Sequence, residues 1–149
     1  MTPSAAQLSS FQTFISSVMG ISSTYLSPTD PNITLALSTA LDFVNLSINN
    51  IAPDLYTLAL NNLAGDFLLQ WAQDLTGQTF FTNARQDYGI NNFVAGVVAS
   101  TADESTSTSL KNPEFMGTMT LMDLQNLKTP YGRQYLMIAQ QFGTLWGLT

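Results

Sequence analysis

The sequence predicts a mainly α-helical fold: a small bundle of about four to five helices, with a long extended arm or β-hairpin between the third and the last helix. Apolar residues recur at spacings of three and four through most of the chain, as they do on one face of a helix. Residues 93–110 are instead rich in β-branched and small hydroxyl residues, which favours extended chain. At 149 residues the chain has the size of a single domain, residues 1–149, with a hydrophobic core.

The first predicted helix covers residues 4–19. Leu8, Phe11, Ile15 and Val18 lie on one stripe, and Gln, Ser and Thr occupy the opposite side. Gly20 is expected to end this helix, because glycine suits the residue that follows a helix.

The second predicted helix covers residues 31–48. Asp30 is a suitable N-cap, and Pro31 suits the first turn, where no backbone N–H is needed. Apolar residues continue at spacings of four, three and four, and we expect the pair Asn49-Asn50 to stop the helix.

The third predicted helix, residues 54–74, has the widest apolar arc. Pro53 and Asp54 open it, and an aspartate in the first turn interacts favourably with the helix dipole. Its main stripe runs from Tyr56 to Trp71, and additional leucines broaden it. A helix that is apolar on so wide an arc is usually covered on several sides, so we expect it to be the core helix.

The remaining elements are shorter. Residues 80–88 fit either a short helix or a turn. Thr118 is a candidate cap for a helix over residues 119–127, and Thr129 with Pro130 begins a last helix over residues 130–142. Gly143 then opens an apolar C-terminal tail, residues 143–149.

The composition argues for an assembly subunit and against nucleic-acid binding. Only 9% of the residues are charged, and neutral polar residues supply most of the polarity, which suits a surface that lies against copies of itself. The net charge is −6, and no Lys or Arg precedes Arg85. Direct DNA binding normally requires clustered Lys and Arg, which are missing here. The acidic balance fits ordinary solubility first, and a conduit could also use an acidic surface to let DNA slide past without sticking.

The residue types also argue against an enzyme. Cysteine and histidine are absent, which excludes Ser–His and Cys–His nucleophiles and removes the two preferred zinc ligands. A catalytic pair formed by a serine with Lys111 or Lys128 is formally possible, but no sequence motif supports it. The adjacent pair Asp103-Glu104 is interpreted as a solvated tip, since neighbours on a strand point to opposite faces. We therefore expect no catalytic residue, no cofactor and no metal.

Two further absences bear on location. No apolar run reaches the length of a membrane span, because Asp42, Asp54 and Asp66 interrupt the most apolar region. No charged segment precedes an apolar stretch at the start, so no secretory signal is visible. We expect a protein made in a cytoplasm and then assembled.

Two stretches together resemble a known family. An extended Gly96-Val97-Val98-Ala99-Ser100-Thr101 segment with alternating Ser and Thr precedes the tetrapeptide Thr129-Pro130-Tyr131-Gly132 and then Tyr135. In this order they resemble the head–tail adaptor, or connector, proteins of tailed bacteriophages, over roughly residues 94–138. The resemblance implies a virion structural protein in the neck between capsid and tail. It implies a homo-oligomeric ring, a dodecamer, beneath the portal protein, with tail or neck proteins as further partners and DNA passing through without specific binding.

The resemblance and the apolar tail define the expected interface. The arm fits either a mobile surface loop or a strand that pairs with a partner, since unpaired strand edges are templates for pairing. The resemblance favours the second and implies contact with neighbouring copies or the portal side. The tail either folds back on the body or docks on a partner, with Trp146 as a suitable anchor. The residues expected at partner interfaces are Val97, Val98, Ser100, Thr101, Asp103, Glu104, Ser105, Thr106, Ser107, Thr108, Ser109, Phe142, Leu145, Trp146 and Leu148. Those expected to fix the last helix are Thr129, Pro130, Tyr131, Gly132, Arg133 and Tyr135.

Two alternatives stay open. A different neck component, such as a stopper or a tail-completion protein, is expected to contain more strand. A non-viral soluble helical module that binds one partner through its tail is expected to be a stable monomer.

Overall fold

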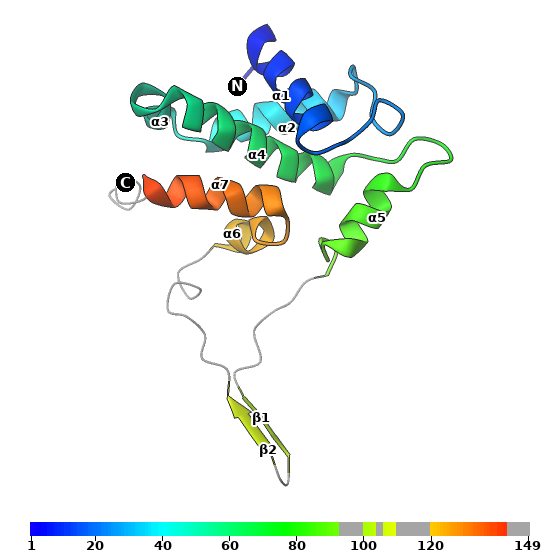
Figure 1. Ribbon diagram of the computed structural model, residues 1–149, viewed down its shortest axis with the longest axis vertical. Coiled ribbons are helices and arrows are strands. Elements are labelled where there is room, and N and C mark those ends of the chain that lie inside the picture. The colour runs from blue at the N-terminus through cyan, green and yellow to red at the C-terminus, as the bar shows by residue number, and fades with distance from the viewer. Residues whose placement is uncertain (93–99, 104–105, 110–119, 143–149) are drawn as a thin grey trace.

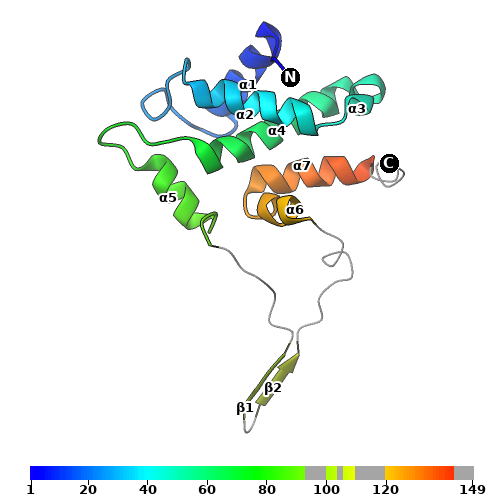
Figure 2. The ribbon, with the colours of Figure 1, turned by 180° about the vertical axis from the view of Figure 1, so that it is seen from behind.

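The computed structural model describes residues 1–92, 100–103, 106–109 and 120–142, and it confirms that the chain is mainly helical (Figure 1). The helices form three layers around α4: α1 and α2 lie on one side, and α6 and α7 lie on the other, as opposite views show (Figures 1 and 2). The described elements are α1 (Ala5–Ser17), α2 (Pro31–Phe43), α3 (Leu46–Ile51), α4 (Pro53–Trp71), α5 (Phe80–Asp87), β1 (Ser100–Asp103), β2 (Thr106–Ser109), α6 (Leu121–Asn126) and α7 (Pro130–Gln141).

The central position of α4 confirms the predicted core helix. Every residue from Ala59 to Leu69 is buried, so this stretch is covered on all sides. Pro53 occupies the first turn, and Asp54 is the acidic residue there, as the sequence predicts. The helix ends at Trp71, three residues earlier than expected, because Ala72 adopts an extended conformation.

The predicted second helix is wrong in its extent: the structure divides residues 31–48 into α2 and the start of α3. Val44, which is buried, adopts an extended conformation and ends α2. The side chain of Asn45 then accepts a hydrogen bond from the backbone N–H of Ser47 at 2.7 Å and caps α3. Asn49 and Asn50 lie inside α3 and do not stop a helix.

The first helix is shorter than predicted. Ser4 and Gln7 form a reciprocal capping box at its start. Phe14 belongs to its buried face, whereas Val18, expected on the apolar stripe, is the C-cap residue and is 60% exposed. Gly20 follows with φ of 67°, a conformation that favours glycine.

Two strands lie within the predicted arm. β1 pairs with β2 in antiparallel register, with Thr101 opposite Thr108. The pair lies apart from the helices in Figure 1. The other residues of the predicted arm, 93–99, 104–105 and 110, fall outside the described residues, so a long arm stays a prediction.

The last two helices begin at side-chain caps. Thr120 forms a capping box with Asp123 at the start of α6. The predicted cap, Thr118, falls outside the described residues. Thr129 caps α7 and Pro130 occupies its first turn, as the sequence predicts.

Candidate interaction surface

A buried hydrogen-bond relay joins the start of α7 to the middle of α4. The hydroxyl of Thr129 donates to the carboxylate of Asp66 and accepts from the backbone N–H of Gly132 at 2.9 Å. The amide of Gln70 donates to the other carboxylate oxygen at 2.7 Å. Asp66 and Thr129 are both fully buried. The cap of α7 is therefore also a tertiary contact with the core helix.

Asp66 is a carboxylate in an apolar environment. Burial raises its pKa from the ordinary value of 3.8 to about 6, against the opposing hydrogen bonds from Thr129 and Gln70. Near neutral pH the charged form prevails. Among the described residues, no cation forms an ion pair with it. Within the described part of the chain, hydrogen-bond donors balance its charge, which makes the geometry of the relay important for stability.

The other residues of the Thr129–Tyr135 segment hold α6, α7 and α1 together. A Cβ on Gly132 would lie 2.1 Å from the carbonyl oxygen of Asn126, so the two helices approach at this glycine. The rings of Tyr131 and Phe14 meet edge to face at 6.0 Å. Arg133 donates to the carbonyl oxygen of Leu127 at 2.9 Å. Tyr135 is half-buried against the core.

The segment that leads into the predicted arm is fastened to the turn between α6 and α7. The ammonium group of Lys128 donates to the carbonyl oxygens of Asn92 at 2.5 Å and Ile90 at 3.2 Å. Gln125 also donates to the Ile90 carbonyl oxygen, at 3.3 Å. We refer to these four residues as the arm base.

Two charged side chains connect the end of α4 with the start of α5, one binding carbonyl oxygens and the other binding N–H groups. Arg85 of α5 donates to the carbonyl oxygens of Leu69 and Ala72 at the end of α4. The carboxylate of Asp74 accepts from the backbone N–H groups of Phe81 and Thr82 at the start of α5. Desolvation raises the pKa of Asp74, but these bonds, the Thr82 hydroxyl and the charge of Arg85 together lower it below its ordinary value.

The three basic side chains in the described part of the chain are therefore committed to the fold. Arg85, Lys128 and Arg133 each donate to backbone carbonyl oxygens. Lys111 lies outside the described residues. The one ion pair among the described residues joins the amino group of Met1 to Asp42 at 2.7 Å.

The predicted interface residues are only partly placed. Ser100, Thr101 and Asp103 lie on β1, and the four residues from Thr106 to Ser109 form β2. Phe142 is half-buried and packs against the core, so this part of the predicted docking tail is already partly covered. Val97, Val98, Glu104, Ser105, Leu145, Trp146 and Leu148 lie outside the described residues.

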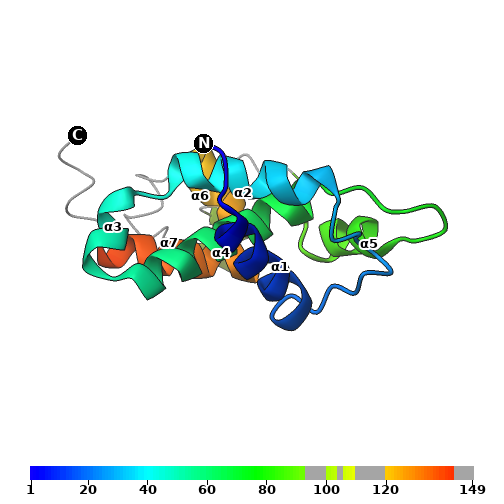
Figure 3. The ribbon, with the colours of Figure 1, turned by 90° about the horizontal axis from the view of Figure 1, so that it is seen from above.

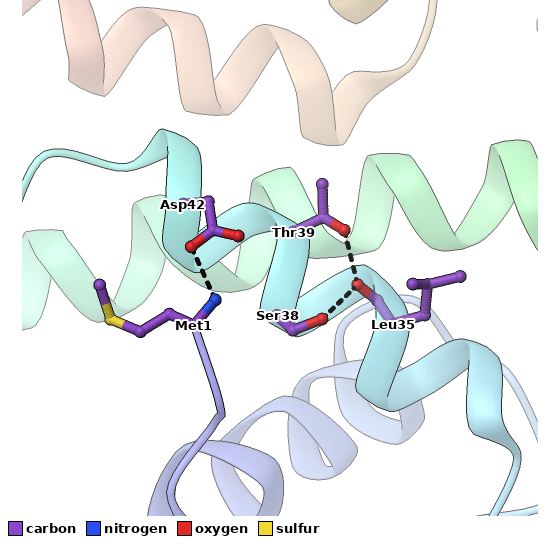
Figure 4. Close-up of polar contacts among 5 residues, drawn as sticks. All are labelled: Met1, Leu35, Ser38, Thr39 and Asp42. Atoms are coloured by element: carbon purple, nitrogen blue, oxygen red, sulfur yellow. Dashed lines mark hydrogen bonds and ion pairs between the residues drawn. The ribbon is translucent and has the colours of Figure 1, made fainter.

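The outer side of α2 is a surface that the sequence predictions missed. Leu35, Ser38, Thr39 and Asp42 lie along it, and Met1 reaches Asp42 (Figure 4). Ser38 and Thr39 donate their hydroxyl hydrogens to the carbonyl oxygen of Leu35 at 3.0 and 2.9 Å. Leu35 is 52% exposed. We call these four residues of α2 the α2 face; the helical spacing of 35, 38, 39 and 42 is the signal that could have identified it.

A cleft also lies between α5 and the three-layered body. Its volume is about 550 Å³, and Leu69, Phe80, Tyr88 and Tyr131 supply much of its lining, with Asp87 also present. Burial, with a smaller contribution from Tyr88, raises the pKa of Tyr131. Among the described residues, no group of acidic side chains is arranged to hold a metal ion. None of the described helices is long and apolar enough to cross a membrane.

Comparisons with protein-family models, with curated proteins and with solved structures found no match.

Proposed function

We propose that this chain is a virion structural protein, the adaptor that joins head to tail beneath the portal of a tailed bacteriophage. The observation that carries the proposal is the arm base. The sequence resemblance rests on an extended segment and on the Thr129-Pro130-Tyr131-Gly132 motif, and Lys128, directly before the motif, contacts Asn92, directly before the arm. The residues that directly precede these two parts thus meet at one place in the fold.

These hydrogen bonds suit a protein whose extended arm leaves a rigid helical body at a fixed position. The relay between Thr129 and Asp66 secures the start of α7 to the core helix. Lys128 and Gln125 in turn bind the carbonyl oxygens of Ile90 and Asn92, just before the predicted arm, and so secure this segment to α6 and its following turn. In the proposed assembly the arm, including β1 and β2, contacts neighbouring copies or the portal, and the tail with Trp146 docks on a partner.

The charge distribution suits a conduit for DNA. The net charge is −6, and the described Lys and Arg side chains are occupied by backbone carbonyl oxygens. Such a surface provides few cations for phosphate groups, so DNA passes without being held. The proposed location is the neck of the virion, after synthesis in the host cytoplasm.

The mainly helical fold favours an adaptor over a stopper, for which we expect more strand. Among the described residues, two four-residue strands are the only strand elements.

The native mass of the purified chain, alone and mixed with the portal protein of the same phage, tests the proposal. A dodecameric ring, or a monomer that becomes a ring on the portal, is the expected result. A chain that remains monomeric with the portal and with DNA-filled heads would overturn the adaptor function and favour a soluble binding module.

A further inference from the structure

The two layers on either side of α4 bury different kinds of side chain. Seen from above, α1 and α2 cover α4, and α7 lies beneath it (Figure 3). The buried residues of α1 and α2 are all apolar: Phe11, Phe14, Ile15, Ile33, Ala36, Leu37, Ala40 and Leu41. We call residues 120–142 the α6–α7 layer. Besides Gly132, this layer buries the apolar Leu136 and Ile138 together with the polar Asn126 and Thr129. Its contact with the core helix is therefore the more polar of the two.

A buried charge lies where the α6–α7 layer meets α4. The carboxylate of Asp66 accepts from the Thr129 hydroxyl and from the amide of Gln70. The described cations of the neighbouring elements donate to backbone carbonyl oxygens instead, and they are Arg85, Lys128 and Arg133. Burying a charge without an opposite charge costs free energy, which is recovered when water reaches the group. Separation of α7 from α4 would admit that water.

An unpaired amide lies in the same layer. Asn126, at the end of α6, is 1% exposed, and neither its amide oxygen nor its amide nitrogen has a hydrogen-bond partner among the described residues. A buried donor and acceptor left unpaired are unfavourable relative to a state in which water binds them. The packed α6–α7 layer thus retains two polar groups, this amide and the Asp66 carboxylate, that an open state would stabilise.

The order of the chain lets this layer move by itself. α6 and α7 follow every other described element in the sequence, so they can leave α4 without drawing another described helix with them. The segment before the predicted arm would stay with the body, because Ile90 belongs to the hydrophobic core and Arg85 ties α5 to the end of α4. Lys128 and Gln125, which hold this segment, belong to the α6–α7 layer.

We propose that the α6–α7 layer undocks from α4 as one unit while α1 to α4 remain folded together. Undocking carries Lys128 and Gln125 away from the carbonyl oxygens of Ile90 and Asn92, and so it releases the arm base. The inference concerns the chain by itself and goes beyond the proposed adaptor function, so its failure would leave that function standing.

Native-state amide hydrogen exchange of the purified full chain, followed by NMR at pH 8 and increasing urea concentration, tests the proposal. We expect the amides of residues 134–137 to exchange at least tenfold faster than those of residues 63–67 in α4, and with a weaker dependence on urea. These amides lie in the first half of α7, so fraying of the C-terminal end of the helix does not explain their exchange.

Two substitutions distinguish undocking from global unfolding. Asp66→Asn removes the buried charge and should slow exchange of the α7 amides about tenfold at pH 8. Ile33→Val is the matched control, because Ile33 is buried on α2 and its packing is shared by the docked and the undocked state. It should speed exchange in α4 about fivefold and leave the α7 amides unchanged.

Three results would each overturn the proposal. Equal exchange rates and equal urea dependence in α7 and α4 would show that the two helices unfold together. Ile33→Val could accelerate α7 as much as α4, which has the same meaning. Asp66→Asn could leave the α7 amides unchanged, which would show that their opening does not hydrate the carboxylate. Circular dichroism checks the fold of both variants, and the wild-type comparison of α7 with α4 requires neither.

Discussion

Asp66 and Thr129 lie 63 positions apart in the sequence, yet the Thr129 hydroxyl donates to the Asp66 carboxylate in the interior of the protein. The same hydroxyl accepts from the N–H of Gly132 and so caps α7. One side chain thereby satisfies a helix end and a buried charge at once. Most helix caps are local and exposed, whereas this one fixes the position of α7 on the core helix α4.

Asp66→Asn should stabilise the protein above neutral pH. The folded-state pKa is raised to about 6 from 3.8, so the contribution of Asp66 to stability is present below about pH 4 and is lost as the pH rises through 6. A difference of about two units corresponds to about 3 kcal/mol. Asparagine removes the buried charge but can still accept from Thr129. Urea unfolding at pH 8 should show a gain of about 1–3 kcal/mol.

The comparison with wild type at pH 4 provides the control. Asp66 is largely protonated in the folded state there, so the advantage of Asn should disappear. Asp74 changes stability in the opposite direction, because its lowered pKa makes its contribution fade in acid, but it is common to both proteins. A stability difference that is the same at pH 4 and pH 8 would show that Asp66 carries no raised pKa.

Thr129→Val should cost about 2–4 kcal/mol of stability at pH 7, because valine keeps the shape but removes both hydrogen bonds of the hydroxyl. The Gly132 N–H loses its acceptor, and the Asp66 carboxylate loses a donor. Thr129→Ser retains the hydroxyl and should remain within about 1 kcal/mol of wild type. Thermal and urea unfolding measure both variants, and a Thr129→Val variant as stable as wild type would show that the two hydrogen bonds of the hydroxyl contribute little to stability.

Much of the fold can be predicted from local signals. The caps Asp30 and Thr129, with proline in the following turn, are short patterns whose chemistry is complete within a few residues. The break at Val44 is harder to predict, because the apolar spacing continues through it, although Asn45 is a local cap for the helix that follows.

The candidate surfaces were harder to predict, because they depend on contacts between distant residues. Lys128 gives no local sign that it binds the carbonyl oxygens of Ile90 and Asn92. Asp66 interrupts an apolar stripe, which in a sequence indicates only a polar position. Its relay to Thr129 becomes visible when α7 is placed on α4.

Gly132→Ala should be strongly destabilising, by about 3 kcal/mol or more, as expected for overpacking against a fixed backbone. The new Cβ would lie 2.1 Å from the Asn126 carbonyl oxygen, so α6 and α7 must move apart. Gly65→Ala is the matched control on α4. Its nearest neighbour would be the flexible side chain of Met19, with Sδ at 3.1 Å, which can adjust, and alanine favours the helix. Similar losses for both variants in thermal unfolding would contradict this reading of Gly132.

Lys128→Met should loosen the arm base without unfolding the helical body. Methionine keeps much of the apolar stem but removes the donor to Ile90 and Asn92, leaving Gln125 as the remaining contact to Ile90. We expect amide hydrogen exchange in residues 88–92 to become at least tenfold faster, while exchange in α4 stays unchanged. Arg133→Met, which removes another donor to a backbone carbonyl, is the control and should leave residues 88–92 protected. Unchanged exchange in Lys128→Met would show that the base is held by the burial of Ile90, and that the lysine contacts do not set the position from which the arm leaves the body.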